Sequence, residues 1–127
     1  FMLQFNRLLI FFACLAGAIS VLVAAYSAHI PGLEESSVRS VNSAIQMLQF
    51  HALALLVVGC IFRNAEANWF SIGSGLFFVI GILLFSVNII LHQLAGVSSF
   101  RSLIPFGGMA FVLGWIALAI AGLLPRQ

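Results

Sequence analysis

The sequence predicts an all-α polytopic membrane protein, a four-transmembrane-helix bundle that forms one integral membrane domain over residues 1–127. Of the 127 residues, 63% are hydrophobic and only 6% are charged, with a mean hydropathy of +1.20. A water-soluble domain of this size cannot bury so much apolar surface, so the surrounding solvent must be lipid. The apolar residues form four runs, and a helix of about 20 apolar residues crosses a hydrocarbon core of roughly 30 Å.

The breaks between these runs define the helices, because only helices and closed barrels satisfy their backbone hydrogen bonds in lipid. We expect helices over about residues 8–28, 36–62, 69–92 and 104–124. Pro31 and Gly32 end the first helix in a turn. Ser36 is the expected N-cap of the second. Trp69 begins the third at the membrane interface, and Pro105 is tolerated in the first turn of the fourth.

The few charged residues lie at or near the ends of the predicted spans. They are Arg7, Arg39, Arg63, Arg101, Arg126, Glu34, Glu35 and Glu66. The net charge of +2 is therefore scattered along the membrane edges, which excludes a nucleic-acid-binding patch. With an even number of spans, three of the arginines share the side of both termini and two lie opposite. The positive-inside rule then favours both termini in the cytoplasm.

Small residues on two of the predicted helices indicate how the bundle packs, since helices in lipid associate through close backbone contact. They recur at four- and three-residue spacing as Ala13, Gly17, Ser20 and Ala24 in the first helix, and as Gly107, Ala110, Gly114 and Ala117 in the fourth. This spacing fits a left-handed bundle. We expect the bulky residues beside these stripes, including Phe11, Phe12, Phe111 and Trp115, to face lipid or a partner. We expect Cys14 and Cys60, which lie inside apolar runs, to be small core residues.

Polar residues inside the predicted spans have two interpretations. A hydrogen-bond network between helices is the structural one, because polar side chains in lipid need partners whatever the function. Its candidate members are Tyr26, His29, Gln46, Gln49, His51, Asn88 and His92. The functional interpretation is that the three histidines bind haem or a metal, or carry protons along a path.

The sequence contains none of the usual signatures of an enzyme or an ion carrier. No nucleophile motif and no HExxH helix occurs. Proton and ion carriers usually hold a carboxylate or a cation inside the membrane, whereas every glutamate here falls in a predicted loop. We therefore predict no catalytic residue, no metal and no cofactor.

Four segments, taken together, resemble the signature blocks of a known family. They are residues 24–29, 49–56, 81–86 and 104–115. The chain resembles the domain of unknown function 423 family, related to transmembrane protein 256, over nearly its whole length. The resemblance implies a small four-helix protein of the bacterial cytoplasmic membrane, or alternatively of the mitochondrial inner membrane, without an established activity. Ser27 and the pair Val87-Asn88 depart from the family pattern, whereas His29 and His51 fall on motif positions.

Three hypotheses follow for the function. The first is a non-catalytic accessory or structural subunit that packs its aromatic outer faces against a larger membrane protein complex or against copies of itself. These faces are rich in Phe11, Phe12, Phe77, Phe78 and Phe111. The second is a small transporter or channel-like protein with a polar vestibule around His29, His51 and His92. The third is a haem or quinone site between the same histidines.

Overall fold

The computed structural model describes residues 2–62 and 68–124, and within these ranges the secondary structure is helical, without strands. The elements are α1 (Met2–Ala28), α2 (Glu35–Ile61), α3 (Trp69–Gly81), the π-helical segment η2 (Ile82–Val87), α4 (Asn88–Ala95), the 3₁₀ turn η3 (Arg101–Leu103) and α5 (Ile104–Leu123). Four helical stretches are long and apolar enough to cross a membrane. The predicted fold class, an all-α bundle of four transmembrane helices, is therefore confirmed.

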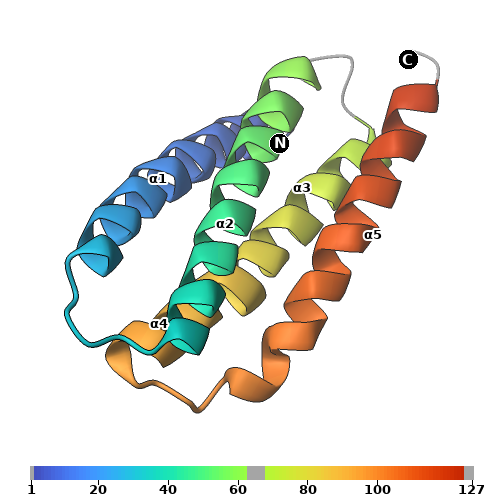
Figure 1. Cartoon of the computed structure of the whole chain (residues 1–127). Coiled ribbons are helices and arrows are strands. Elements are labelled where there is room, and N and C mark those ends of the chain that lie inside the picture. Colours follow the sequence, from blue (N-terminus) through green and yellow to red (C-terminus); the bar gives the residue numbers. More distant parts are fainter. Residues whose placement is uncertain (1, 63–67, 125–127) are drawn as a thin grey trace.

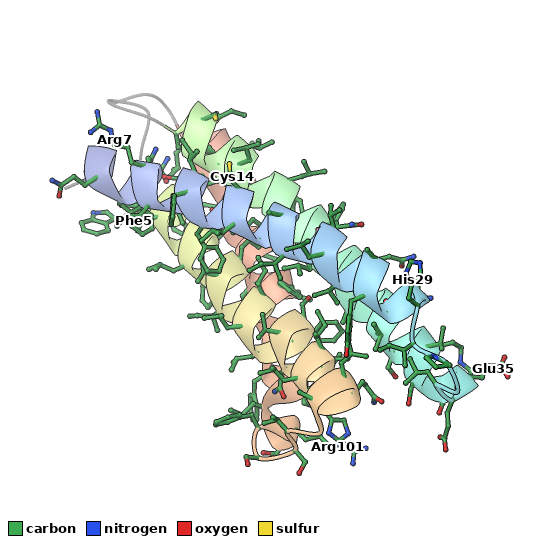
Figure 2. All side chains as sticks on the ribbon, turned by 90° about the vertical axis from the view of Figure 1, so that its left-hand side faces the viewer. Phe5, Arg7, Cys14, His29, Glu35 and Arg101 are labelled. Atoms are coloured by element: carbon green, nitrogen blue, oxygen red, sulfur yellow. The ribbon has the colours of Figure 1, made fainter. Side chains whose placement is uncertain are left out.

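The spans pack as two pairs, α1 with α2 and α3 with α5, and α2 also contacts α3, η2 and α4. Its central position makes α2 the most buried span, while α1 and α5 expose most of their surface. The start of α1 and the end of α5 lie at the same end of the bundle (Figure 1). Figure 2 shows Arg7 at that end and His29, Glu35 and Arg101 at the opposite end.

Several helix ends differ from the sequence-based expectation. The first helix begins at Met2 rather than near residue 8. The N-cap of α2 is Glu34, which is extended at φ −61° and ψ 149°, so the expectation that Ser36 caps this helix is wrong. Ser36 is already helical. Pro105 does lie in the first turn of α5, where its missing N–H breaks no helical bond.

The third span is not a uniform α-helix. It changes to π-helix at Ile82 and returns to α-helix at Asn88. It then ends at Gly96, whose φ of 72° is the left-handed conformation that often terminates a helix. Short π segments inside α-helices are rare and are frequently found at functional sites.

The small-residue stripe of α5 faces α3 and η2 at close range. A Cβ placed on Gly107 would lie 2.5 Å from the backbone nitrogen of Phe85, and one on Gly114 would lie 2.7 Å from the ring of Phe78. Ala110 and Ala117 are buried in the same contact. The backbones of the two elements therefore approach closely, as small-residue packing requires.

The stripe of α1 is only partly used inside the chain. Ala13 and Ser20 are buried, but Ala24 is half-exposed, and a Cβ on Gly17 would have no neighbour within 4 Å. The glycines that bring α1 close to its neighbours belong instead to α2 and α3. A Cβ on Gly59 would lie 2.6 Å from Ile10, and one on Gly75 would lie 2.7 Å from Leu9.

Two expectations about outward-facing residues need correction. Phe111 and Phe78, expected on the outer aromatic faces, are only 5% and 0% exposed. The reason is that each ring fills the space beside a glycine of the opposite helix, Phe111 beside Gly81 and Phe78 beside Gly114. Conversely Cys14 and Cys60, both expected in the core, are free and exposed cysteines.

Candidate functional site

His51 lies in the middle of α2 and is almost completely enclosed, with 2% of its surface exposed. The indole N–H of Trp115 on α5 donates to His51 Nε2 at 3.1 Å. Since an indole nitrogen can only donate, Nε2 must be the unprotonated acceptor. His51 Nδ1 lies 2.7 Å from the carbonyl oxygen of Met47 and, in this tautomer, donates its proton to it. Both ring nitrogens are thereby occupied.

Aromatic rings surround this histidine. The ring of Phe111 stacks on His51 with centroids 3.7 Å apart and planes 12° from parallel. Phe50 meets it edge-on at 5.2 Å, and Phe78 lies at 5.4 Å. We call His51, Phe50, Phe78, Phe111 and Trp115 the aromatic cluster. It joins α2, α3 and α5 through ring pairs that are stacked, edge-on or tilted.

The other polar residues predicted for a network lie elsewhere. No hydrogen bond within residues 2–62 and 68–124 joins any two of the seven candidates. His29 is exposed, and its Nδ1 lies 2.7 Å from the carbonyl oxygen of Ala25 in its own helix. Tyr26, Gln46 and Gln49 are exposed, and their side chains have no hydrogen-bond partner among the described residues.

The two remaining candidates lie on α4, near the third loop. Asn88 is buried, and its side-chain amide donates to the carbonyl oxygen of Phe100 at 2.6 Å. The Nδ1 atom of His92 is buried without a hydrogen-bond partner in the described part of the chain. The third loop therefore has one amide-to-backbone contact and one open nitrogen, but no bond between the two side chains.

Two asparagines that the sequence analysis did not single out hold helix ends together. The amide of Asn6 on α1 donates to the carbonyl oxygens of Gly59, at 3.3 Å, and of Phe62 at the end of α2. The amide of Asn68 donates to the carbonyl oxygen of Ala121 in α5 at 3.4 Å. The last carbonyls of a helix have no intrahelical donor, which makes them natural acceptors.

A sequence signal for one of these asparagines was available. Asn68 is the N-cap of α3, and its side chain accepts from the backbone N–H of Ser71 while the Ser71 hydroxyl accepts from the backbone N–H of Asn68. This reciprocal pair is a capping box. The contact of Asn6 with α2 had no local signal, because it depends on how two helices cross.

The described residues contain no group of three or more His, Cys, Asp or Glu side chains placed to hold a metal ion. A histidine binds haem iron or a metal through an unprotonated ring nitrogen. In His51 that nitrogen accepts from Trp115. His51 could become a ligand only if the aromatic cluster opened.

Two open cavities lie along the contact between α1 and α2. One, of about 320 Å³, lies near the first loop and includes Ala24 and Ser27 of α1 and Gln46 of α2 in its lining. The other, of about 400 Å³, lies further along and is lined in part by Gly17 and Gln49. Together they form what we call the α1/α2 groove. His51 lines neither of them.

Comparison with known proteins gives one family and a set of bacterial relatives. The family model described as "Protein of unknown function (DUF423)" matches residues 23–108. The chain is 28% identical to "UPF0382 inner membrane protein YgdD" of Escherichia coli (strain K12) over 119 residues, which covers 92% of this chain and 89% of the relative. It is 34% identical to a "UPF0382 membrane protein" of Staphylococcus epidermidis (strain ATCC 12228) over 117 residues, covering 84% and 91% of the two chains. No solved structure gives a significant match.

Proposed function

This chain belongs to the DUF423 family, and on that premise we propose that it is a non-catalytic accessory or structural subunit of the bacterial cytoplasmic membrane. It acts by packing its lipid-facing surface against a larger membrane protein complex or against copies of itself. The relative in Escherichia coli is named an inner membrane protein, which supports the location.

The enclosure of His51 carries the proposal. A catalytic or ligand-binding histidine needs an accessible ring nitrogen or a path for a substrate. In His51 one nitrogen bonds to Met47, the other bonds to Trp115, and Phe111 covers the ring. This buried polar side chain of α2 therefore joins helices, through its bond to Trp115 on α5.

The outer surface supplies the second support. Large apolar side chains are exposed along every span, among them Phe11 at 65%, Leu53 at 65%, Leu76 at 47% and Met109 at 59%. These surfaces face lipid or other transmembrane helices, and the polar loops between them are short. A partner is therefore recognised through contacts with these lipid-facing side chains, inside the membrane.

The alternative of a transporter with a vestibule around His29, His51 and His92 has less support. A vestibule would need water-filled space that reaches His51, and this side chain is 2% exposed and packed among aromatic rings. The same enclosure weakens the third hypothesis, a haem or quinone site between the three histidines.

The test is to purify the tagged chain from native membranes in mild detergent or native nanodiscs, identify bound proteins by mass spectrometry, and scan visible absorbance. We expect a stoichiometric membrane partner, or an oligomer of the chain, without pigment beyond that of the partner. A lone, unpigmented monomer under these conditions would contradict the proposal. Unassigned Soret absorbance would point to haem ligation instead.

A further inference from the structure

The third span contains two buried polar atoms without a hydrogen-bond partner. Ser86 belongs to the π segment η2, and this residue is 0% exposed. His92 belongs to α4, which continues the span after η2 (Figure 1). Within residues 2–62 and 68–124, Ser86 Oγ and His92 Nδ1 are buried and bond to nothing. Unpaired polar groups inside a membrane protein are costly, so this part of the span is held in an unfavourable arrangement.

The π geometry accounts for the unpaired serine. In an α-helix a serine hydroxyl can donate to the carbonyl oxygen three or four residues before it. Ser74, in the α-helical part of the same span, does so to Ser71 at 2.8 Å. Ser86 lies where the span is π-helical, and its hydroxyl reaches no carbonyl in the described part of the chain. Since Ser74 and Ser86 are both 0% exposed, the two serines differ in helix type and not in burial.

The surroundings of η2 are tight toward α5 and open toward α1. A Cβ on Gly107 of α5 would lie 2.8 Å from the carbonyl carbon of Leu84, so the two backbones are in close contact. Leu83 and Val87, by contrast, line an apolar cavity of about 130 Å³ that is shared with α1. These two side chains therefore have space to move while α3 stays packed on α5.

We propose that the third span has two arrangements, because the π segment can convert to α-helix and turn α4. A π turn bonds residue i to residue i+5, so it holds about one residue more than an α turn. Returning that residue to an α-helix rotates α4 by about 100° and shifts it by about 1.5 Å toward the third loop. We call the arrangement described above the π form and the rotated one the α form.

The two forms exchange one polar contact for another. In the π form Asn88 donates to the carbonyl oxygen of Phe100, and Ser86 is unpaired. In the α form the rotation breaks the Asn88 bond, and the carbonyl oxygen of Ile82, four residues earlier, becomes available to the Ser86 hydroxyl. One bond is lost and one is gained, so both forms are populated. Anything that contacts α4 more favourably in one form shifts the balance toward it.

This inference does not depend on the proposed function, because it concerns motion within a single chain.

The test measures distances between spin labels by double electron–electron resonance in frozen nanodiscs, which detects both forms however fast they interconvert. Cys14 and Cys60 are first replaced by serine, and labels are attached at Leu91→Cys on α4 and Val112→Cys on α5, both exposed positions. A rotation of about 100° moves a group on the outside of a helix by about 8 Å. We therefore expect two populations of distances.

The matched control pair is Leu76→Cys with Val112→Cys. Leu76 is exposed on α3, which precedes the π segment and packs on α5 in both forms. We expect a single population for this pair.

Replacing Ser86 with Ala tests the cause of the exchange. The variant removes the hydroxyl that is unpaired only in the π form, so we expect the ratio of π form to α form to rise by about fivefold or more. Ser74→Ala is the control, because Ser74 is equally buried but already bonded, and it lies before the π segment. It should leave the ratio unchanged.

Four results would overturn the inference: a single population for Leu91→Cys with Val112→Cys, two populations for both label pairs, a ratio that Ser86→Ala does not raise, or an equal rise in the two serine variants. Each of them would leave the proposed function as it stands, because that function is tested by the proteins that co-purify with the chain.

Discussion

Individual polar residues inside this bundle bond mainly to backbone atoms or to a single partner side chain. Asn6, Asn68 and Asn88 donate to carbonyl oxygens of other elements, and His51 accepts from Trp115. Such contacts contribute about 0.6 to 2 kcal/mol each in a membrane. These hydrogen bonds are a structural reason for polar residues in the spans, and no catalytic role is needed to account for them.

Replacing Trp115 with Phe tests the contact to His51. The substitution keeps an aromatic ring in the cluster but removes the N–H that bonds to His51 Nε2. A buried acceptor is then left without a donor, and we expect a loss of about 1 to 2 kcal/mol in the free energy of unfolding. The measurement is SDS-induced unfolding in mixed micelles, followed by circular dichroism.

The matched control is Trp69→Phe, because Trp69 is 75% exposed and lies at the start of α3. It should change stability by less than about 0.5 kcal/mol. Equal losses in the two variants would mean that the contact between Trp115 and His51 contributes nothing specific.

Among the helices, the contact between α5 and the third span depends on glycines facing aromatic rings or backbone. Gly81 makes room for Phe111, Gly114 makes room for Phe78, and Gly107 faces the backbone of η2 directly. Lipid supplies no hydrophobic force between helices, so such dispersion contacts hold the pair together. The π segment lies where α5 comes closest to backbone atoms.

The adjacent pair Gly107 and Gly108 allows a sharp test of this contact. In Gly107→Ala the new Cβ would lie 2.5 Å from Phe85 N and 2.8 Å from the carbonyl carbon of Leu84. Backbone atoms cannot rotate away, so we expect a loss of about 1 to 3 kcal/mol in the free energy of unfolding. SDS-induced unfolding measures it.

Gly108→Ala is the control, since a Cβ there meets nothing within 4 Å. Alanine favours a helix over glycine, so this variant should be neutral or more stable by up to about 1 kcal/mol. If both variants lost the same stability, close approach at Gly107 would not be the cause.

For the whole molecule, four spans bring the start of α1 and the end of α5 to one side of the membrane (Figure 1). The sequence places Arg7, Arg63 and Arg126 toward that side. The positive-inside rule then favours the cytoplasm for both termini.

Fusions expressed in Escherichia coli test this orientation. Green fluorescent protein attached to the C-terminus should fluoresce, and alkaline phosphatase at the same place should be inactive, because the phosphatase folds only outside the cytoplasm. Phosphatase fused after Gly32, in the first loop, should be active. Active phosphatase at the C-terminus would reverse the orientation.

Hydropathy alone was enough to predict the spans, because lipid imposes both their length and their helical conformation. Small-residue spacing marked one face of α5, and in the structure this face meets η2 at Gly107 and α3 at Gly114. Both are local properties that can be read along a single helix.

The interior of the bundle could not be predicted in this way. The spans are apolar on nearly all sides, so periodicity does not tell a core face from a lipid face. Phe111 lies inside because Gly81, on another helix, leaves room for its ring. His51 is satisfied by Trp115, which is 64 residues away. Such pairings depend on how the helices cross, and that crossing results from the packing of all four spans together.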